Sequence, residues 1–530
     1  MRRQMRNQQV QYALTRDVPM IPIVIIIVYL ALLLALGTCS HRFFRGTSAD
    51  FFVASRSIGP FMLLMSVFGT TMTAFALVGS TGKAFTSGIG VYGLMASSSG
   101  LIHSACFFLV GIRLWAIGKR HGYVTQCQFF RERFDSPALG YFLFPILVAL
   151  IVPYLLIGLL GAGAVMRGLT MKQFPELFTS TNGAVPPWLT GLVICAVVLT
   201  YVFLGGVRST AWANTFQTIV FMVTGIIAFF MIAKALGGLG KASQLVADNA
   251  PKHLAREGLI GKWQFFTYFF VPLSVGMFPH LFQHWLTARS AKTFRITVIF
   301  HPICIMIVWV PCILIGIWMV GHGLIPPGGN PNAILGVAVK KLVQSPWLTG
   351  LLTAGILAAI MSSLDSQFMC VGTMFTNDVV VRLFGEGRFS DKQKLWLGRG
   401  FVVTIVAITY LLSLVSTKHI FDLAVWCFSG FAGLFPIVLA AVYWRRATRA
   451  GAIAAVLVTT GVWAYLFHLS GYGGEYLLFR DLFSGKSGGE DGIMPVAVIT
   501  IACAVTLVVV SLVTKAPSAA TVDKFLPAAR

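Results

Sequence analysis

Charged residues are scarce in this chain. Only 11% of its 530 residues are Asp, Glu, Lys or Arg, whereas 57% are hydrophobic. A soluble globular protein needs charge to cover its surface, and average usage is about 25%. The scarcity excludes a soluble protein and predicts one that is integral to a membrane.

Acidic residues are the rarer of the two charge types. The chain has 17 Asp and Glu against 40 Lys and Arg, which gives a net charge of +23. A nucleic-acid-binding protein would gather this charge on one domain or stripe. Here the basic residues are scattered in small groups between apolar runs. That distribution is typical of the cytoplasmic loops of a membrane protein, so we expect no nucleic-acid partner.

The sequence also lacks paired cysteines. Its nine cysteines include no CxxC pair, and most of them fall inside apolar runs. A disulfide framework or a cysteine-based metal centre is therefore not indicated. We interpret the cysteines as small hydrophobic residues of the core.

Long apolar runs are what the sequence has in abundance. A helix needs about 20 apolar residues to cross a bilayer, and about thirteen such runs are present. They cover residues 21–40, 59–82, 90–116, 139–166, 188–205, 211–236, 264–286, 296–320, 347–376, 395–416, 420–443, 451–469 and 494–514. The first run could be mistaken for a signal peptide, but it lacks a clear small-residue cleavage site and many similar runs follow it.

These runs predict the fold class. Lipid tolerates only helices and closed barrels, and unbroken apolar runs exclude the alternating pattern of a barrel. The prediction is an all-α integral membrane protein with about 13 transmembrane helices. No segment between the runs is long enough for a second folded domain. We expect a single transmembrane domain at residues 21–514, an N-terminal tail at 1–20 and a C-terminal tail at 515–530.

The loops predict an orientation. Lys and Arg concentrate in alternate loops, including those at residues 40–58, 113–138 and 377–399. Because cytoplasmic loops carry the excess of basic residues, the N-terminus is expected outside and the C-terminus in the cytoplasm. The Arg-rich N-terminal tail and the basic loop at 234–263 point the other way.

Two of the predicted spans are interrupted. The run at 59–82 contains "VFGTTMTAF", and the run at 264–286 contains "FVPLSVGMFPH". Broken helices at membrane depth are tolerated where the freed backbone lines a cavity or is buried in protein. The two interruptions lie five spans apart, which favours a transporter built from inverted repeats at about 59–236 and 264–443. A simple kink at each position is the alternative.

A polar cluster lies inside the run at 347–376. In "SSLDSQ", Ser362, Asp365 and Ser366 follow the i, i+3, i+4 spacing of one helical face, with Ser363 beside it. A charge in mid-membrane costs at least ~2.5 kcal/mol, so Asp365 is expected to face a cavity or a partner. Carboxylate, hydroxyl and carbonyl oxygens suit an alkali cation. Serines that merely bond their own helix or aid helix packing are the alternative.

Several motifs along the chain carry a family resemblance. They are "DFFVASRSIGPFMLLMSVFGTTMTA", "GGVRSTAWANTFQ", "AGILAAIMSSLDSQ", "NDVV" and "APSAA". With these motifs at compatible spacing, the chain resembles the sodium/solute symporter family. The resemblance implies a leucine-transporter-type fold with a five-plus-five inverted repeat, in the plasma (inner) membrane, with sodium as the coupling ion.

The resemblance also implies a sodium site. Its ligands would be the carbonyls of Gly69 and Met72 at the first break and of Ala359 in the polar run, with the hydroxyls of Ser362 and Ser363. All five positions hold compatible residues. The same serines stand out from their spacing alone.

The chain departs from the family pattern in its charges. Thr71 stands where relatives carry an acidic residue after the first break, and Asn214 stands in "WAN" where relatives carry aspartate. Asp365 stands where many relatives have a neutral residue. If the spans that carry Asn214 and Asp365 face each other, the carboxylate that relatives have on the first span lies on the second span in this chain. We therefore expect Asp365, Ser366 and Asn214 to form a second cation site.

The solute site is expected near the breaks. Its candidate residues share this region and include aromatic and polar side chains: Thr71, Thr73, Phe75, His103, Val275, Phe278, His280 and Gln283. Some family members carry tryptophan and tyrosine before the Pro-His pair, where this chain has Val271 and Val275, so its solute is expected to differ from theirs. Packing without ligand contact is the alternative for each aromatic residue.

These features predict sodium-coupled symport of a small polar or anionic organic solute by alternating access. No protein partner is indicated beyond the lipid bilayer. Proton coupling through Asp365 is the alternative within transport. A membrane metalloenzyme using the HxxxH pair His280 and His284 is a rival of another class. A transporter-like sensor is a further rival, although a tail of about sixteen residues is too short for a signalling domain.

Overall fold

The computed structural model describes residues 20–40, 48–325, 329–483 and 491–526. The predicted N-terminal tail, apart from Met20, lies outside the described residues. The fold of the described residues is helical, and their only β-type pairings are the isolated bridges Ile58 to Ala288 and Leu478 to Ile493. The all-α prediction agrees with this architecture.

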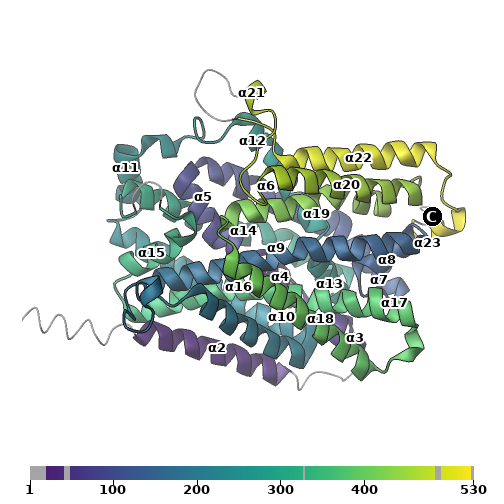
Figure 1. Cartoon of the computed structure of the whole chain (residues 1–530), viewed down its shortest axis with the longest axis horizontal. Coiled ribbons are helices and arrows are strands. Elements are labelled where there is room, and N and C mark those ends of the chain that lie inside the picture. Colours follow the sequence, from purple (N-terminus) through teal and green to yellow (C-terminus); the bar gives the residue numbers. More distant parts are fainter. Residues whose placement is uncertain (1–19, 41–47, 326–328, 484–490, 527–530) are drawn as a thin grey trace, which may run out of the picture.

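Long helices form the body of the molecule and run side by side (Figure 1). They are α2 (Met20–Ser40), α9 (Pro137–Thr170), α10 (Pro187–Ala235), α14 (Phe294–Gly321), α16 (Pro346–Met374), α18 (Asp391–Val415), α19 (Ile420–Tyr443), α20 (Arg449–Leu469) and α22 (Pro495–Val513). Within the described residues, ten helices are long and apolar enough to cross a membrane, and two further helix pairs pass the same test together but are bent. The predicted total of thirteen stays a prediction.

Two of the predicted spans join in one long helix. α10 has 49 residues and contains a non-helical residue, Gly206, with φ 58° and ψ −150°. A positive φ favours glycine because it has no Cβ. A Cβ there would also lie 2.6 Å from the carbonyl oxygen of Phe51. Gly206 thus divides α10 between the predicted spans 188–205 and 211–236.

Shorter helices and turns complete the chain. The helices are α3 (Ser48–Val53), α4 (Pro60–Thr71), α5 (Ser80–Ser87), α6 (Ser97–Cys106), α7 (Ile112–His121), α8 (Gln126–Arg133), α11 (Leu239–Asn249), α12 (Lys262–Thr267), α13 (Pro279–Thr287), α15 (Ile334–Leu342), α17 (Val381–Phe384), α21 (Arg480–Phe483) and α23 (Ala519–Phe525). The turns that matter for the site are η3 (Phe75–Gly79), a π-helical turn, and η8 (Tyr268–Gly276), a 3₁₀ turn.

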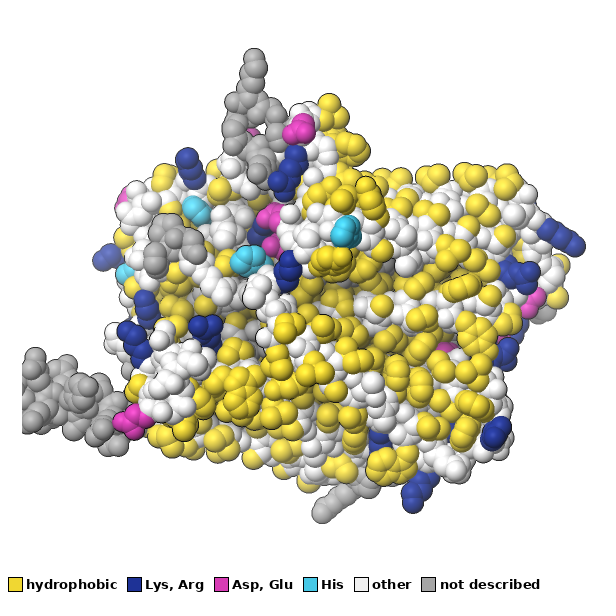
Figure 2. Space-filling model, in the orientation of Figure 1, with side chains coloured by type: hydrophobic (Ala, Val, Ile, Leu, Met, Phe, Trp, Pro, Cys, Tyr) yellow, Lys and Arg dark blue, Asp and Glu magenta, His cyan; other side chains and the backbone are white. Residues whose placement is uncertain are grey.

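The surface is banded. Figure 2 shows hydrophobic side chains spread over the middle of the face in view, whereas most Lys and Arg lie toward the two ends. Exposed large apolar residues such as Leu32, Val223 and Val508 belong to the long helices. Such a band matches the hydrocarbon layer of a bilayer, so the long helices cross the membrane.

The two ends of the bundle differ in their short helices. α11 and α15 lie at one end, and α3, α8, α17 and α23 lie at the other (Figure 1). We refer to these as the α15 end and the α8 end. None of these helices is predicted from the sequence, because they are too short or too polar to span a bilayer.

The core of the bundle forms where α10 packs along α16. Their approach is close at Gly355 of α16, where a Cβ would lie 1.8 Å from the hydroxyl oxygen of Thr224 on α10. Small residues allow such contacts between membrane helices. All residues of α16 from Leu352 to Met374 are buried, which places the predicted polar cluster in the protein interior.

The α8 end contains a turn in left-handed backbone conformation. Ala54, Ser55 and Arg56 have φ of 48°, 49° and 52°. Their position is stabilised by Arg56, whose guanidinium donates to the backbone oxygens of Gly118 at 3.0 Å and Tyr123 at 2.7 Å. Non-glycine residues with positive φ are costly and persist only where surrounding contacts hold them.

Candidate cation and solute sites

The first interrupted span is a broken helix. α4 and the segment Phe75–Ser87 meet at an angle of 58°. The intervening Met72, Thr73 and Ala74 are buried, with exposed fractions of 0%, 2% and 0%. The break is capped on both sides, since Met72 N donates to Phe68 O at 3.0 Å and Phe75 N donates to the hydroxyl of Thr73 at 3.0 Å. Part of the freed backbone is therefore satisfied within the protein.

The second interrupted span is bent as well. The segments Lys262–Gly276 and Pro279–Thr287 meet at 48°. Pro272 lies within η8 and Pro279 begins α13, so each removes a backbone donor where the helix changes course. Gly276 is required by packing, since a Cβ there would lie 2.4 Å from the Phe435 ring. Both sequence interruptions thus correspond to real breaks.

The first break faces the polar cluster of α16. The hydroxyl of Ser362 donates to Gly69 O at 2.8 Å, across the two helices, and also lies 2.8 Å from Ala359 O on its own helix. Three of the five predicted sodium ligands therefore meet at one point. Gly69 is needed for this approach, because a Cβ would lie 2.3 Å from the hydroxyl oxygen of Thr218.

The other two predicted sodium ligands lie close by in the chain. Met72 follows directly after α4 and is its C-terminal cap residue. Ser363 is 2% exposed, and its hydroxyl donates to Ile360 O at 2.9 Å. That bond is the local serine contact expected of a purely structural residue, so Ser363 would have to rotate or share its oxygen to bind an ion.

Asp365 is buried among donors from two helices. Tyr201 of α10 donates its hydroxyl to Oδ2 at 2.9 Å, and the hydroxyl of Ser366 lies 3.1 Å from Oδ1. The exposed fraction of Asp365 is 0%. Asn214 of α10 lies 2.9 Å from the Ser366 hydroxyl, so the structure brings all three predicted members of the second cation site together.

The Asn214 amide completes the hydrogen bonds of this carboxylate. Its nitrogen donates to both carboxylate oxygens of Asp365 and to Ser362 O, each at 3.0 Å, and its oxygen accepts from the Ser366 hydroxyl at 2.9 Å. Oxygen groups from α10 and α16 therefore converge around Asp365, and such hard donors suit an alkali cation.

Three further residues belong to this cluster, although the sequence did not predict them there. Tyr201 donates to Asp365, and Nε2 of His284, expected only as part of an HxxxH metal pair, lies 3.0 Å from the Ser366 hydroxyl. Gln217 Oε1 lies 3.3 Å from the Asn214 amide nitrogen, and the i, i+3 spacing of these two residues was a usable signal. Nothing local marks Tyr201, since it lies in an apolar run 164 residues from Asp365.

A cavity lies between the two breaks. Its lining residues surround about 380 Å³ of space free of protein atoms, which includes space open to solvent. Its aromatic lining residues are Phe75, Tyr154, Tyr268, Phe278, Trp309 and Phe428. Its polar lining residues are Thr71, Ser99, His103 and Ser274, and the remainder are Val271, Pro272 and Val275. We call it the central cavity.

Five of the eight predicted solute residues line the central cavity: Thr71, Phe75, His103, Val275 and Phe278. The other three do not. Thr73 caps the break, and Gln283 donates to Phe52 O and the Thr373 hydroxyl, both at 2.8 Å. His280 packs its ring against those of Phe278 and Tyr154, at centroid distances of 5.0 and 5.5 Å.

An aromatic layer separates the central cavity from a second cavity near α12. Phe421 lines that second cavity, and the centre of its ring lies 5.2 Å from that of Phe75 and 6.5 Å from that of Tyr268. We call the second space the outer cavity. Asp422, Glu475 and Gln264 also line it.

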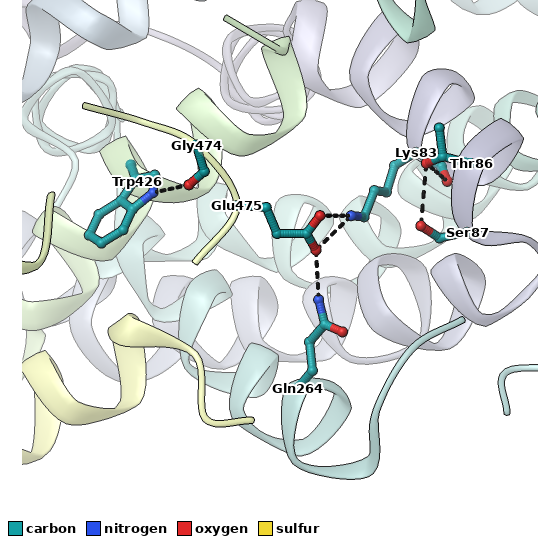
Figure 3. Close-up of polar contacts among 7 residues, drawn as sticks. All are labelled: Lys83, Thr86, Ser87, Gln264, Trp426, Gly474 and Glu475. Carbon is teal, nitrogen blue, oxygen red and sulfur yellow. Dashed lines mark hydrogen bonds and ion pairs between the residues drawn. The ribbon is translucent and has the colours of Figure 1, made fainter. Parts of the chain in front are cut away.

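An ion pair lies beside the outer cavity. Lys83 of α5 donates to both carboxylate oxygens of Glu475, at 2.9 and 3.0 Å, and Gln264 of α12 donates to the same carboxylate at 3.0 Å (Figure 3). Burial would raise the pKa of Glu475, but the Lys83 ammonium and the Gln264 amide outweigh it and lower that pKa below its usual value. The ammonium also lies 5.4 Å from the centre of the Phe421 ring.

The model of the sodium:solute symporter family matches residues 51–459, which include both breaks and the polar cluster. The chain belongs to the sodium:solute symporter family. This membership confirms the resemblance carried by the motifs. It supports sodium-coupled transport as the activity of the chain.

Proline carriers are among the similar relatives of this symporter. The sodium/proline symporter of Escherichia coli (strain K12) is 26% identical over 499 residues, which cover 90% of each chain. The osmoregulated proline transporter OpuE of Bacillus subtilis (strain 168) is 25% identical over 483 residues, with 90% of this chain and 92% of the relative covered.

Solved structures show the same fold. A Na⁺-coupled sialic acid symporter in a substrate-bound outward-open state aligns with TM-score 0.73 and 17% identity, over 94% of this symporter and 99% of that chain. Mhp1, a nucleobase-cation-symport-1 family transporter, aligns with TM-score 0.53 and 15% identity, over 89% and 97% of the two chains. These neighbours have the leucine-transporter-type fold, as the resemblance implied.

Proposed function

We propose that this protein is a sodium-coupled symporter of a small polar or anionic organic solute, working by alternating access in the plasma (inner) membrane. Sodium binds between the first break and α16, and the solute binds in the central cavity. The contact of Ser362 with Gly69 O and Ala359 O carries the proposal. A hydroxyl that already links two helices can exchange its hydrogen bonds for an ion bound by the same oxygens.

The proposed sodium ligands are the carbonyls of Gly69, Met72 and Ala359 and the hydroxyls of Ser362 and Ser363. Four of them are buried at 2% exposure or less, and all are hard oxygen donors suited to an alkali cation. The ion would hold α4 against α16. Because a ligand shifts a conformational equilibrium only through its different affinity for the two states, sodium would favour the state in which this contact is formed.

A second cation binds at Asp365, Ser366 and Asn214 in our proposal. The support is the meeting of three oxygen-bearing side chains in the protein interior: the Ser366 hydroxyl lies 3.1 Å from the Asp365 carboxylate, and the Asn214 amide contacts both residues. An unpaired carboxylate buried in a membrane is costly, and sodium supplies its missing countercharge. A second site would raise the sodium-to-solute ratio.

The orientation we propose has the N-terminus outside and the C-terminus in the cytoplasm, following the basic loops. The α15 end then faces the exterior, and the outer cavity is the entrance for solute. In this arrangement Lys83 and Glu475 close the entrance, with the ring of Phe421 beneath them. Inward movement of each sodium gains ~2.3 kcal/mol per 100 mV of membrane potential.

The test is solute uptake into proteoliposomes that contain the purified protein. A panel of amino acids, carboxylates and sugars is offered under an inward sodium gradient, an inward potassium gradient and an inward proton gradient. Uptake of one solute class under the sodium gradient alone supports the proposal. Uptake driven by protons and indifferent to sodium favours the alternative in which Asp365 carries a proton.

A further inference from the structure

The lining of the central cavity contains polar side chains but no Asp, Glu, Lys or Arg. A bound solute therefore meets no countercharge from any lining side chain. Since burying a charge without a partner is expensive, the charge that this cavity accepts must be set by its hydrogen-bonding groups and by any ion bound next to it.

One buried donor in the cavity wall lacks an acceptor. The indole Nε1 of Trp309 has no hydrogen-bond partner among the described residues, and Trp309 is 4% exposed. An indole N–H can only donate, so a bound solute must offer an oxygen to satisfy it. An unsatisfied buried donor is destabilising, which is a reason for the solute to carry an acceptor at this point.

Other polar groups reinforce this preference. Ser99 and Ser274 both line the cavity, and each is 2% exposed. His103 uses Nδ1 in a contact of 3.1 Å with His301 Nε2, which leaves its Nε2 for a further hydrogen bond. Two hydroxyls and an imidazole can all donate to a negatively charged oxygen.

The cavity offers an ammonium no countercharge, since no carboxylate is among its lining residues. Backbone oxygens at the breaks already accept hydrogen bonds: Thr73 O from Ala76 N at 3.0 Å, Ser274 O from Met277 N at 2.9 Å and Phe278 O from Phe282 N at 3.1 Å. A buried ammonium without a carboxylate is costly, so the lining does not call for an amine on the solute.

The aromatic side chains form a compact apolar wall. Phe428 contacts Phe75 and Tyr154 edge to face, each at a centroid distance of 5.1 Å, and contacts Phe278 at 5.6 Å. A small hydrocarbon ring or branched chain would bury apolar surface against such a wall, which favours its binding.

We propose that the central cavity selects a monocarboxylate with a compact hydrocarbon body and does not require an amine. The carboxylate accepts from Trp309 and the neighbouring hydroxyls, and the body lies against the aromatic wall. The inference rests on the proposed function, because the countercharge comes from sodium at the adjacent break, where Thr71 of the cavity precedes Met72 of the sodium site. Sodium would thereby increase the affinity for the solute.

Three ring compounds of similar size test this inference. Cyclopentanecarboxylate has the ring and the carboxylate, proline adds the amine, and pyrrolidine has the amine without the carboxylate. Titration calorimetry of the purified protein in sodium chloride should show binding of cyclopentanecarboxylate at least as tight as that of proline, and no binding of pyrrolidine. The affinity for cyclopentanecarboxylate should fall at least tenfold when potassium replaces sodium. Tighter binding of proline, binding of pyrrolidine, or no binding of any of the three overturns the inference.

A matched pair of variants locates the carboxylate. Trp309→Phe keeps an aromatic ring but removes the donor, so the affinity for cyclopentanecarboxylate should fall about tenfold, the usual effect of a hydrogen bond to a charged group. Trp318→Phe is the control, since its indole lies on the same helix but donates to Ser243 away from the cavity. Equal affinity of Trp309→Phe and wild type overturns the inference.

A further measurement tests sodium binding separately from monocarboxylate binding. Thermal unfolding of the solute-free protein in sodium and in potassium chloride reports on the sodium site alone. If sodium stabilises the protein and cyclopentanecarboxylate does not bind, the monocarboxylate proposal falls while sodium coupling stands. If sodium has no effect either, both fall.

Discussion

The hydroxyl of Tyr201 on α10 donates to Oδ2 of Asp365 on α16 at a distance of 2.9 Å. Both residues are fully buried, with exposed fractions of 0%. This bond joins the longest helix of the bundle to the helix that carries the candidate cation ligands. It therefore lies where ion binding and helix packing affect each other most directly.

Replacing Tyr201 with Phe should make the protein more dependent on sodium. The variant removes a donor from a buried carboxylate, which costs about 1–3 kcal/mol of folding free energy. A cation at Asp365 would offset part of that loss. We expect a lower melting temperature than wild type in potassium chloride and a smaller difference in sodium chloride. Tyr154→Phe, away from this carboxylate, is the control, and an identical deficit in both salts contradicts the second site.

Replacing Ser362 with Ala should weaken sodium binding without unfolding the protein. The variant loses a hydroxyl that contacts Gly69 O and Ala359 O, and the methyl group fits the same space. A lost interaction with a charged ligand is worth about 1.5–3 kcal/mol, so the half-saturating sodium concentration for uptake should rise at least tenfold. Ser413→Ala, whose hydroxyl donates to Tyr410 O on its own helix, is the matched control. Wild-type sodium dependence in Ser362→Ala would refute its role as a ligand.

Replacing Gly69 with Ala should disturb the contact between α4 and α10. Its Cβ would lie 2.3 Å from the Thr218 hydroxyl oxygen, a distance that forces a shift. Thr218→Ala removes that oxygen. We expect Gly69→Ala to lose most sodium-driven uptake and the double variant to recover part of it. Equal loss in the single and the double variant would place the effect elsewhere.

Breaking the Lys83 and Glu475 ion pair should open the central cavity to solvent. In Lys83→Met the charge that lowers the pKa of Glu475 is lost. A cysteine in place of Ser99, with Cys39→Ser as background, should then react faster with a membrane-impermeant thiol reagent. Lys83→Arg, which keeps the charge, should behave like wild type. An unchanged rate in Lys83→Met would show that the pair does not close the entrance.

The same ion pair predicts a pH dependence. The pKa of Glu475 is lower in the folded protein than its usual value, so its stabilising contribution is present at neutral pH and is lost as the pH falls through the folded value. We expect the reactivity of the Ser99→Cys reporter to rise in acid in the wild-type background. The Glu475→Gln variant should show the faster rate at every pH.

Much of the fold follows from the sequence because its signals are local. Apolar runs mark the spans, and the two breaks coincide with glycine and proline residues such as Gly69, Gly276 and Pro279, which weaken or interrupt helices. The i, i+3, i+4 spacing likewise placed Ser362, Asp365 and Ser366 on one buried face. The short helices at the bundle ends escaped prediction because they need not cross the bilayer.

The candidate sites were predicted less completely, because they depend on contacts between distant segments. Gln283 was expected near the solute, but its amide bonds Phe52 O and the Thr373 hydroxyl instead. Tyr154 and Trp309 were missed, since an aromatic residue in an apolar run gives no sign of whether it faces a cavity or lipid. Only the packing of helices decides between those two environments.

The sodium-to-solute ratio of the reconstituted protein tests the central claim most directly. Reversal potentials of solute-coupled current are measured over a series of sodium gradients for wild type and Asp365→Asn. The account predicts a sodium-dependent reversal potential in both, with one sodium fewer per solute in Asp365→Asn and partial recovery in the Asp365→Ser, Asn214→Asp double variant. A reversal potential that follows the proton gradient and ignores sodium would contradict the account, and an unchanged ratio in Asp365→Asn would remove the second site from it.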